Sequence, residues 1–199
     1  MTFDSTKFWS GRYNRGGNSG AGSYKRLAKY KAEIINNFVI ENDIQNVLEL
    51  GCGDGNQLNL SNYKNYVGFD VSKKALEICK EKFKQDSSKS FYSISSFNEE
   101  INRAELSLSL DVIYHLVEDH VYRKHLNDLF NSSTKYVIIY SSNYDNRHSK
   151  HVLHRSFIKD INRGWSLVKE IKNKYPYNSD IPNTSFSDFF IFKKDENIY

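Results

Sequence analysis

Residues 47–55, Val-Leu-Glu-Leu-Gly-Cys-Gly-Asp-Gly, run from a hydrophobic segment straight into three glycines at alternate positions. Asp70 ends a second hydrophobic segment, nineteen positions after Gly51. Glycines let the backbone turn sharply and approach a ligand without a Cβ in between, and a carboxylate at the end of the neighbouring strand can accept both hydroxyls of a ribose. The pattern predicts a site for a nucleoside cofactor. A tight strand-to-helix turn in another kind of Rossmann-like protein is the alternative.

The glycine spacing differs from that of the dinucleotide loop. That loop has the pattern G-x-G-x-x-G and places a pyrophosphate at a helix N-terminus, whereas here the third glycine, Gly55, comes one residue early. Glu49 also precedes the first glycine. A carboxylate is a poor neighbour for a pyrophosphate and a good one for an ammonium or sulfonium group.

With these residues the chain resembles the class I S-adenosylmethionine-dependent methyltransferases. Their first motif, E/D-x-G-x-G-x-G, matches Glu49 to Gly55 at every fixed position. The resemblance implies that the glycine loop wraps the methionine part of S-adenosylmethionine and that Asp70 holds the ribose hydroxyls. The cofactor-binding residues expected are Trp9, Tyr13, Glu49, Gly51, Cys52, Gly53, Asp70, Val71, Ser96, Phe97 and Asp111.

The third motif departs from the family pattern. Many relatives place an acidic residue after the third strand to bind the adenine amino group, but residues 91–97 offer only serine there. We expect Ser96 to take this role less strongly. Packing against Phe69, Val71 or Phe97 and contacts with backbone groups are the other expected sources of adenine binding.

Apolar runs alternate with helical patterns, which favours a parallel sheet covered by helices. Strands are expected at 46–50, 66–70, 91–94, 105–110 and 136–141, with helices in the gaps, one of them capped by Ser72 and one spanning 118–130. Two further strands, 165–172 and 187–193, form a terminal hairpin. The fold class is α/β. The resemblance implies a Rossmann-like, mostly parallel seven-stranded sheet with helices on both faces and an antiparallel C-terminal strand.

The expected domain organisation is a Gly-rich N-terminal lid over residues 1–23 and a single methyltransferase domain over 24–199. Five glycines within residues 11–22 disfavour regular structure, so this segment is expected to be mobile unless something binds it. Residues 8–13 resemble the lid of small bacterial methyltransferases, which implies that Trp9, Tyr13 and a basic residue close over the cofactor. The run continuing to Tyr24 resembles a subset associated with surface-polysaccharide pathways. A disordered arm is the alternative.

The expected catalytic residues, Asp111 and His115, follow the fourth strand, and residues 108–116 resemble the family's fourth motif. This resemblance implies that Asp111 meets the methionine end of the cofactor. If a helical turn begins at Asp111, the two side chains share a face, and a neutral imidazole at His115 could take a proton from a substrate hydroxyl. Packing or a hydrogen bond to the substrate is the alternative role for His115.

The densest cationic segment follows the fifth strand and contains Arg147, His148, Lys150, His151, His154 and Arg155. It suits an anion, so a phosphorylated, nucleotide-linked or carboxylated substrate is expected, with Tyr114, His148, His151 and Arg155 as substrate residues. A solvated loop is the alternative. A metal site is not expected because no H-E-x-x-H pattern or cysteine set is present.

Composition limits the other possibilities. The chain has 199 residues, of which 39% are hydrophobic and 26% charged, without a run long enough to span a membrane and without a secretory signal, so we expect a single cytoplasmic domain. Cys52 and Cys79 are expected to be small buried residues. The net charge of +4 attracts polyanions weakly, and the basic residues at 25, 26, 29 and 31 are interpreted as a solvated helix face.

The predicted function is S-adenosylmethionine-dependent O-methylation, or alternatively N-methylation, of a small anionic or sugar-like acceptor, such as a surface-polysaccharide precursor. A nucleic-acid or protein methyltransferase is an alternative. The nucleobase amine version of that alternative is disfavoured because Asp111-Val112-Ile113-Tyr114 stands where an Asn/Asp-Pro-Pro-aromatic motif is expected. A non-catalytic cofactor-binding partner is the other alternative. Neither the acceptor's identity nor the oligomeric state follows from the sequence.

Overall fold

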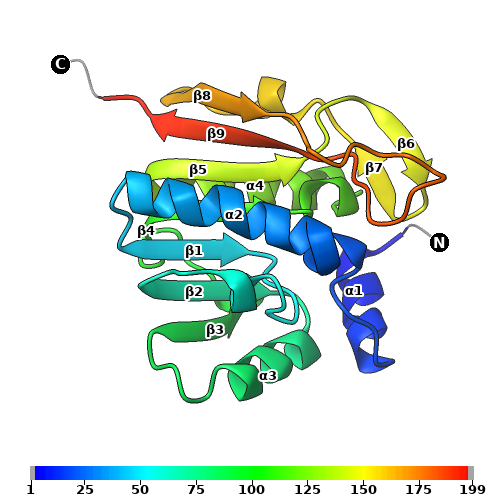
Figure 1. The fold of residues 1–199 in the computed structure, drawn as a ribbon, viewed down its shortest axis with the longest axis horizontal. Helices are drawn as coiled ribbons and strands as arrows, with labels where there is room; N and C mark the ends of the chain where they lie inside the picture. Colours follow the sequence, from blue (N-terminus) through cyan, green and yellow to red (C-terminus); the bar gives the residue numbers. More distant parts are fainter. Residues whose placement is uncertain (1–2, 197–199) are drawn as a thin grey trace.

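The computed structural model describes residues 3–196 of the chain, and its centre is a seven-stranded sheet (Figure 1). The strand order is β3-β2-β1-β4-β5-β9-β8. These strands are β1 (Asn46–Leu50), β2 (Asn65–Asp70), β3 (Lys89–Ser93), β4 (Ala104–Leu110), β5 (Ser133–Ser141), β8 (Trp165–Ile171) and β9 (Asp188–Lys194). The four described α-helices are α1 (Ser5–Asn14), α2 (Lys25–Glu41), α3 (Lys73–Lys82) and α4 (Asp119–Asn131).

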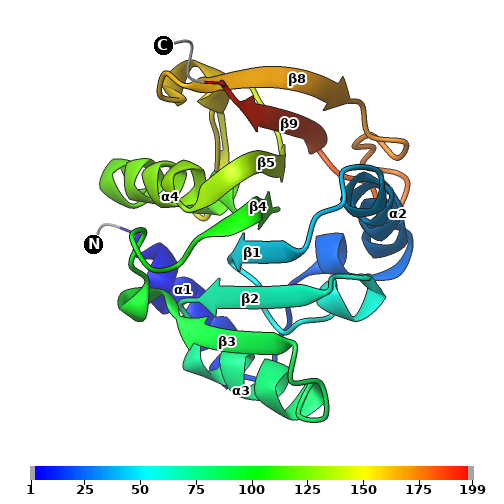
Figure 2. The same cartoon turned by 90° about the vertical axis from the view of Figure 1, so that its left-hand side faces the viewer.

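Side chains that alternate along the strands fill two separate cores. On β5, Ile138 and Tyr140 pack with residues of α2 and α3, while Val137 and Ile139 pack with residues of α4. This period of two places alternate residues on opposite faces of the sheet. Figure 2 shows α2 and α4 on opposite sides of the sheet. The central strands β1, β4, β5 and β9 are largely buried because both of their faces are covered, whereas β8 at the edge of the sheet is mostly exposed.

The strand directions place the ends that carry functional residues at one edge of the sheet. Strands β1 to β5 pair in parallel, and β9 is inserted antiparallel between β5 and β8. The carboxyl ends of β1, β2, β4 and β5 therefore meet, together with the loop that joins β8 to β9. Ligands bind at this edge in open parallel sheets.

The expected fold class is confirmed, and so are the strands, with boundaries that differ by up to three residues. The Ser72 hydroxyl caps α3 by accepting a hydrogen bond from the Ala75 N–H at 3.3 Å, as expected. The helices expected in every gap are not all present. Among residues 3–196, only short turns and loops join β1 to β2 and β3 to β4.

Two elements were not predicted from the sequence. A small antiparallel hairpin of β6 (Asn146–Ser149) and β7 (Val152–His154) follows β5. The expectation of irregular structure over residues 11–22 is wrong for residues 11–14, which form the end of α1 (Ser5–Asn14). The Asp4 side chain caps this helix by accepting from the Lys7 N–H at 2.8 Å. The expected lid, 1–23, and domain, 24–199, include residues 1–2 and 197–199, which lie outside the described residues.

Other sequence expectations concern burial. Cys52 and Cys79 are buried and free, as expected. The interpretation of Lys31 as part of a solvated face is wrong, because its side chain is 0% exposed and pairs with Asp111. None of the helices within residues 3–196 is long and apolar enough to cross a membrane.

Candidate functional site

A cavity of about 330 Å³ lies at the carboxyl edge of the sheet, which is within the size range of small-molecule sites. Its wall combines the glycine loop, the ends of β2 and β4, α1 and one side of α4. Of the expected cofactor-binding and catalytic residues, it contains Trp9, Tyr13, Glu49, Gly51, Cys52, Gly53, Asp70, Val71, Asp111 and His115.

The three glycines after β1 all take the left-handed conformation that favours glycine, with φ angles of 93°, 56° and 69° for Gly51, Gly53 and Gly55. Asp70, at the end of β2, fixes this loop. Its two carboxylate oxygens accept hydrogen bonds from the N–H groups of Gly53 at 2.9 Å and Ser72 at 2.8 Å. Burial raises the pKa of Asp70 to about 6. The loop and this carboxylate therefore form one cradle in the cavity wall.

A second buried carboxylate lies beside the loop. Glu49 is only 4% exposed, and the Tyr66 hydroxyl donates a hydrogen bond to it at 2.7 Å. Burial raises the pKa of Glu49 to about 7. A cationic ligand in the cavity would favour the ionised form of this group.

The N-terminal segment closes over the glycine loop. Ser19 and Asp54 exchange two hydrogen bonds, from the Ser19 N–H at 3.1 Å and from the Asp54 N–H at 3.0 Å. The hydroxyls of Tyr13 and Ser19 lie 2.8 Å apart. A Cβ at Gly53 would lie 2.2 Å from the Ser19 hydroxyl oxygen, so only glycine permits this contact. Trp9 and Tyr13 of α1 thereby form part of the wall.

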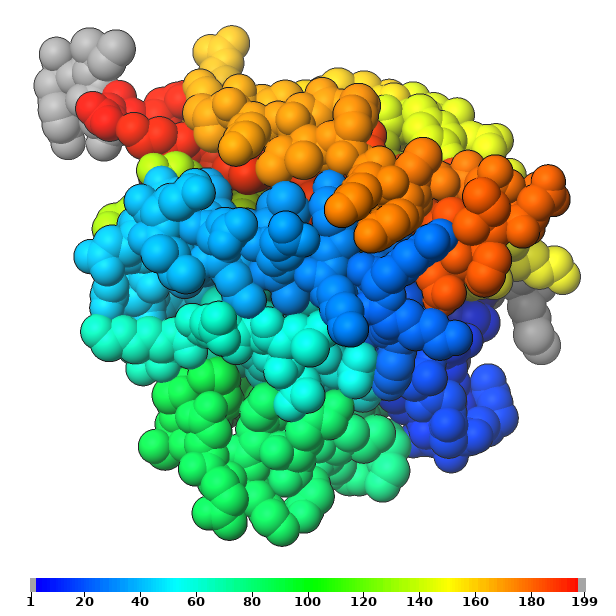
Figure 3. All heavy atoms as spheres, in the orientation of Figure 1, coloured from blue at the N-terminus to red at the C-terminus, as the bar shows by residue number. Residues whose placement is uncertain are grey.

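The start of α2 contacts the segment between β8 and β9 at the surface. Arg26, at the start of α2, donates to the carbonyl oxygens of Pro182 at 2.7 Å and Asn183 at 2.8 Å. In the space-filling view the N-terminal part of the chain, in blue, lies against the orange segment before β9 (Figure 3). The segment between β8 and β9 is thus attached to the start of α2.

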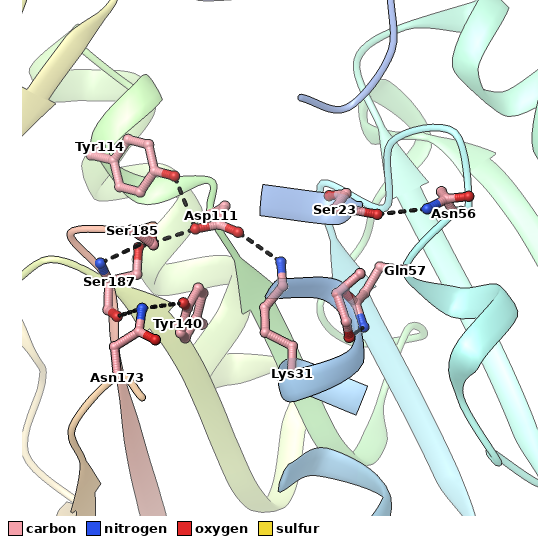
Figure 4. Close-up of polar contacts among 11 residues, drawn as sticks. Ser23, Lys31, Asn56, Gln57, Asp111, Tyr114, Tyr140, Asn173, Ser185 and Ser187 are labelled. Carbon is pink, nitrogen blue, oxygen red and sulfur yellow. Dashed lines mark hydrogen bonds and ion pairs between the residues drawn. The ribbon is translucent and has the colours of Figure 1, made fainter. Parts of the chain in front are cut away.

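The Asp111 carboxylate is held by three donors (Figure 4). Lys31 Nζ lies 2.6 Å from Oδ2, while the hydroxyls of Tyr114 at 2.9 Å and Ser187 at 3.0 Å donate to Oδ1. A Cβ at Gly22 would come within 2.4 Å of Oδ2, so the N-terminal segment also passes directly over it. Asp111 therefore joins α2, the end of β4, the segment before β9 and the N-terminal segment. This arrangement favours a positioning role over proton transfer for its carboxylate.

His115 lies in the cavity wall as a neutral imidazole. Its Nδ1 is 3.0 Å from the carbonyl oxygen of His151, and because a carbonyl only accepts, Nδ1 carries the proton and Nε2 keeps the lone pair. Burial lowers the pKa of His115 to about 4. The ring packs edge-on against Trp9, with centroids 4.8 Å apart. Nε2 is consequently the basic atom of this side chain.

Two of the residues expected to bind adenine, Ser96 and Phe97, do not line the cavity. Ile94 and Ser95 line the cavity, whereas the Ser96 hydroxyl donates to the Ser93 carbonyl at 2.7 Å and Phe97 packs edge-on against Phe69. The reason is a short helical turn, Ile94–Ser96, which rotates the side chains after β3. Ser96 and Phe97 thus do not lie in the cavity wall.

The four expected substrate residues are dispersed. Tyr114 bonds to Asp111, His148 is exposed on β6, and the His151 ring stacks on Phe8 with centroids 4.8 Å apart. Arg155 pairs with Asp119 at 2.9 Å and lies over the Tyr122 ring. None of the four lines the cavity. Their assignment to the substrate stays a prediction, and the six-residue cationic cluster does not form one surface because His154 is buried.

Several residues of the wall were not found from the sequence. His125 of α4 lies in the wall with its Nε2 2.8 Å from the Ser109 hydroxyl, and burial lowers its pKa to about 4. His125 is not one of the apolar positions that predicted this helix, and nothing near it in the sequence indicated a cavity. Among residues 3–196, no group of three or more His, Cys, Asp or Glu side chains is arranged to hold a metal ion.

Part of the chain that carries this site is similar to a family of methyltransferase domains. Residues 47–136 match the family model described as a methyltransferase domain, and this segment contains the glycine loop, Asp70 and Asp111. No curated protein matches the chain in sequence.

Solved structures share the fold over nearly the whole chain. N-methyltransferase NodS from Bradyrhizobium japonicum WM9, in complex with S-adenosyl-L-homocysteine, has a TM-score of 0.77 at 15% identity, covering 97% of this chain and 100% of that one. Magnesium protoporphyrin IX methyltransferase from Synechocystis PCC 6803, with bound S-adenosylmethionine, has a TM-score of 0.66 at 12% identity, covering 98% and 99%. The methyltransferase domain of bacterial CtHen1-C has a TM-score of 0.67 at 20% identity, covering 86% and 100%.

The residues present fit S-adenosylmethionine. Asp70 offers a carboxylate suited to ribose hydroxyls, Glu49 a buried carboxylate suited to a cation, and Gly51 and Gly53 a backbone without side chains in the cavity wall. A Cβ at Gly51 would lie 2.5 Å from a Val112 methyl group, so this close approach also requires glycine.

Proposed function

We propose that this chain, whose residues 47–136 match a methyltransferase domain, transfers the methyl group of S-adenosylmethionine to a hydroxyl oxygen of a small anionic or sugar-like acceptor, such as a surface-polysaccharide precursor. The proposal rests on His115. A hydroxyl must lose its proton when its oxygen gains a methyl group, and a neutral imidazole with an unprotonated Nε2 in the cavity wall can accept that proton.

The other residues of the site bind S-adenosylmethionine and align its methyl group with the acceptor. When bound, S-adenosylmethionine supplies an electrophilic methyl group on a positively charged sulfur. Glu49 provides the opposite charge, Asp70 and the glycine loop fix the orientation, and Asp111 keeps the segment that carries His115 in place. Alignment of this kind can contribute about 7 kcal/mol or more, whereas a general base contributes roughly 10² to 10⁴-fold in rate.

The direct test is incubation with S-adenosylmethionine carrying a ¹³C-labelled methyl group and a panel of nucleotide-linked sugars, sugar phosphates and amines. The carbon chemical shift of the product distinguishes O-methyl from N-methyl. An O-methyl product supports the proposal, and an exclusively N-methyl product contradicts it.

Two variants separate cofactor binding from proton transfer. Asp70→Ala should weaken binding of S-adenosylmethionine by about 1 to 3 kcal/mol in calorimetry, because its ribose contacts are charge-assisted. His115→Ala should lower kcat by about 10²-fold or more while cofactor affinity stays within about threefold. Equal losses of kcat and affinity in His115→Ala would assign the ring to packing instead.

A nitrogen acceptor is the main competing outcome, since one solved structure with this fold is an N-methyltransferase. A neutral amine attacks without a base, so His115→Ala would then keep most of its turnover. Methylation of a nucleic acid or protein, or cofactor binding without turnover on any acceptor, would also contradict the proposal. The proposal places the reaction in the cytoplasm, with which the free thiols of Cys52 and Cys79 are compatible.

A further inference from the structure

Five aromatic side chains gather outside the cavity, where the β6–β7 hairpin meets the segment between β8 and β9. We call this group the aromatic platform; it consists of Tyr144, His148, His154, Tyr177 and Phe186. The rings of Tyr177 and Phe186 stack with centroids 3.8 Å apart, and His148 meets Phe186 edge-on at 5.3 Å. Tyr144 and Tyr177 are 40% and 49% exposed. Tyr177 stacks on Phe186 and Tyr144 stacks on His154, so each exposed tyrosine keeps one ring face for a ligand.

His154 gives the platform an unused polar group. Its side chain is 1% exposed, and its Nδ1 lies 2.6 Å from the Ser142 hydroxyl oxygen. Its Nε2 is buried without a hydrogen-bond partner among the described residues. Nε2 is a donor or an acceptor depending on the tautomer, so in either case one hydrogen bond is left to be made. Such an orphan group between ring faces is suited to a ligand hydroxyl.

The platform is fixed to the loop that carries His115. The Ser187 hydroxyl, one residue after Phe186, donates to Asp111, and the Asn173 side chain donates to the Tyr140 hydroxyl at 2.7 Å and to the Ser187 carbonyl at 2.9 Å (Figure 4). The rings of Tyr114 and His154 have centroids 5.8 Å apart. The segment that carries Phe186 and the hairpin that carries His154 are therefore both held close to Asp111 and Tyr114.

We infer that the aromatic platform is the acceptor subsite and binds the face of a pyranose ring. This inference rests on the proposed function and narrows its acceptor to the sugar-like class. A pyranose has an apolar face of C–H groups, which carry slight positive charge and pack on the negative face of an aromatic ring, and a rim of hydroxyls. One hydroxyl would satisfy His154 Nε2, which binding must first uncover because the nitrogen is buried.

Charge supports a neutral ring over an anion at this subsite. None of the platform residues is a lysine or arginine, and the nearby Arg155 is engaged by Asp119. An anion would find only His148 as an exposed basic side chain within the platform. The aromatic faces and the unpartnered nitrogen therefore favour a neutral ligand that has an apolar face and hydroxyl groups.

The test is saturation-transfer NMR with the methyl glycosides of glucose, galactose and mannose, recorded with S-adenosyl-L-homocysteine present. The wild-type chain should transfer saturation to the ring protons of at least one glycoside. Tyr177→Leu and Phe186→Leu should each reduce this signal about fivefold or more. Tyr92→Leu is the matched control, because Tyr92 is also 49% exposed but lies on β3, at the other end of the strand order, and it should keep the full signal.

The remaining outcomes overturn the inference. Binding of none of the glycosides, an unchanged signal in both platform variants, or an equal loss in Tyr92→Leu would each do so. Binding of phenol in place of every glycoside would assign the platform to an aromatic acceptor. His154→Phe retains the packing and removes Nε2, so a signal that matches the wild type would exclude the proposed hydroxyl contact.

Failure of this inference is distinct from failure of the proposed function. Methylation of a sugar hydroxyl at wild-type kcat/KM in both platform variants would leave the function intact and reject the subsite. Glycoside binding at the platform with methyl transfer to nitrogen alone would reject the function and retain the subsite.

Discussion

Asp111 combines a strained backbone with a carboxylate surrounded by donors. Its φ angle of 60° lies in the left-handed region, which costs an aspartate free energy that its surroundings must offset. Lys31, fully buried on α2, supplies the only ion-pair partner of Asp111 among the described residues. The pair therefore holds the backbone at the end of β4, from which His115 projects one turn later.

We predict that Lys31→Met and Asp111→Asn each lower the free energy of unfolding by about 3 to 5 kcal/mol, because each leaves a buried group without its partner. The double variant should lose less than the sum, since neither charge then remains. Urea unfolding measures all three values. Lys74→Met is the control, as its ion pair with Glu77 is exposed and should contribute no more than about 1 kcal/mol. Additive losses in the double variant would show that the pair is not coupled.

At the scale of elements, the N-terminal segment and the glycine loop form one unit. Gly53 and Gly164 both have positive φ angles, 56° and 95°, but their surroundings differ. A Cβ at Gly53 would collide with Ser19 and Tyr13, whereas one at Gly164 would meet nothing within 4 Å. The two positions therefore separate the effect of backbone strain from the effect of displacing the segment.

We predict that Gly53→Ala weakens binding of S-adenosylmethionine by about tenfold or more, because the added methyl group pushes the segment and Tyr13 away from the cavity. Gly164→Ala should cost only about 1 kcal/mol of stability and leave the affinity unchanged. Calorimetry for binding and thermal unfolding for stability measure the two effects. Equal affinities in both variants would mean that closure of the segment does not contribute to binding.

The sequence predicted the elements whose causes are local. The strand before Gly51 and the helix after Ser72 follow from periodicity and capping within a few residues. Helix α1 was missed because the density of glycine argued against it, while the Asp4 cap and the packing of Phe8 and Trp9 on histidines outweigh the roughly 1 kcal/mol cost of Gly11 in a helix.

In the site, too, the sequence predicted only the residues that belong to a local motif. Asp70 and the glycine loop form a contiguous motif, so their place in the cavity follows from local spacing. The burial of Lys31 depends on Asp111, 80 positions away, and the Ser187 contact spans 76 positions. The orphan nitrogen of His154 likewise arises only when the hairpin and the segment before β9 come together. No local pattern carries such information.

At the scale of the whole molecule, the carboxyl edge of the sheet places ionisable groups where burial opposes their charge. The pKa of Glu49 is raised to about 7, whereas the pKa of His115 is lowered to about 4. Both groups lie in the cavity wall, where a bound ligand can contact them. Glu49 and His115 consequently make opposite contributions to the pH dependence of the free energy of unfolding.

The folded pKa of Glu49 lies above its ordinary value of 4.5, so its stabilising contribution is full below pH 4.5 and is lost as the pH rises through 7. Relative to wild type, Glu49→Gln should therefore gain up to about 3 kcal/mol of stability between pH 4.5 and pH 8. The folded pKa of His115 lies below its ordinary value of 6.5, so its contribution is full above pH 6.5 and is lost as the pH falls toward 4. His115→Gln should accordingly gain relative to wild type as the pH falls. Urea unfolding at pH 4.5, 6 and 8 measures both differences, and differences that stay constant with pH would show that neither group titrates differently on folding.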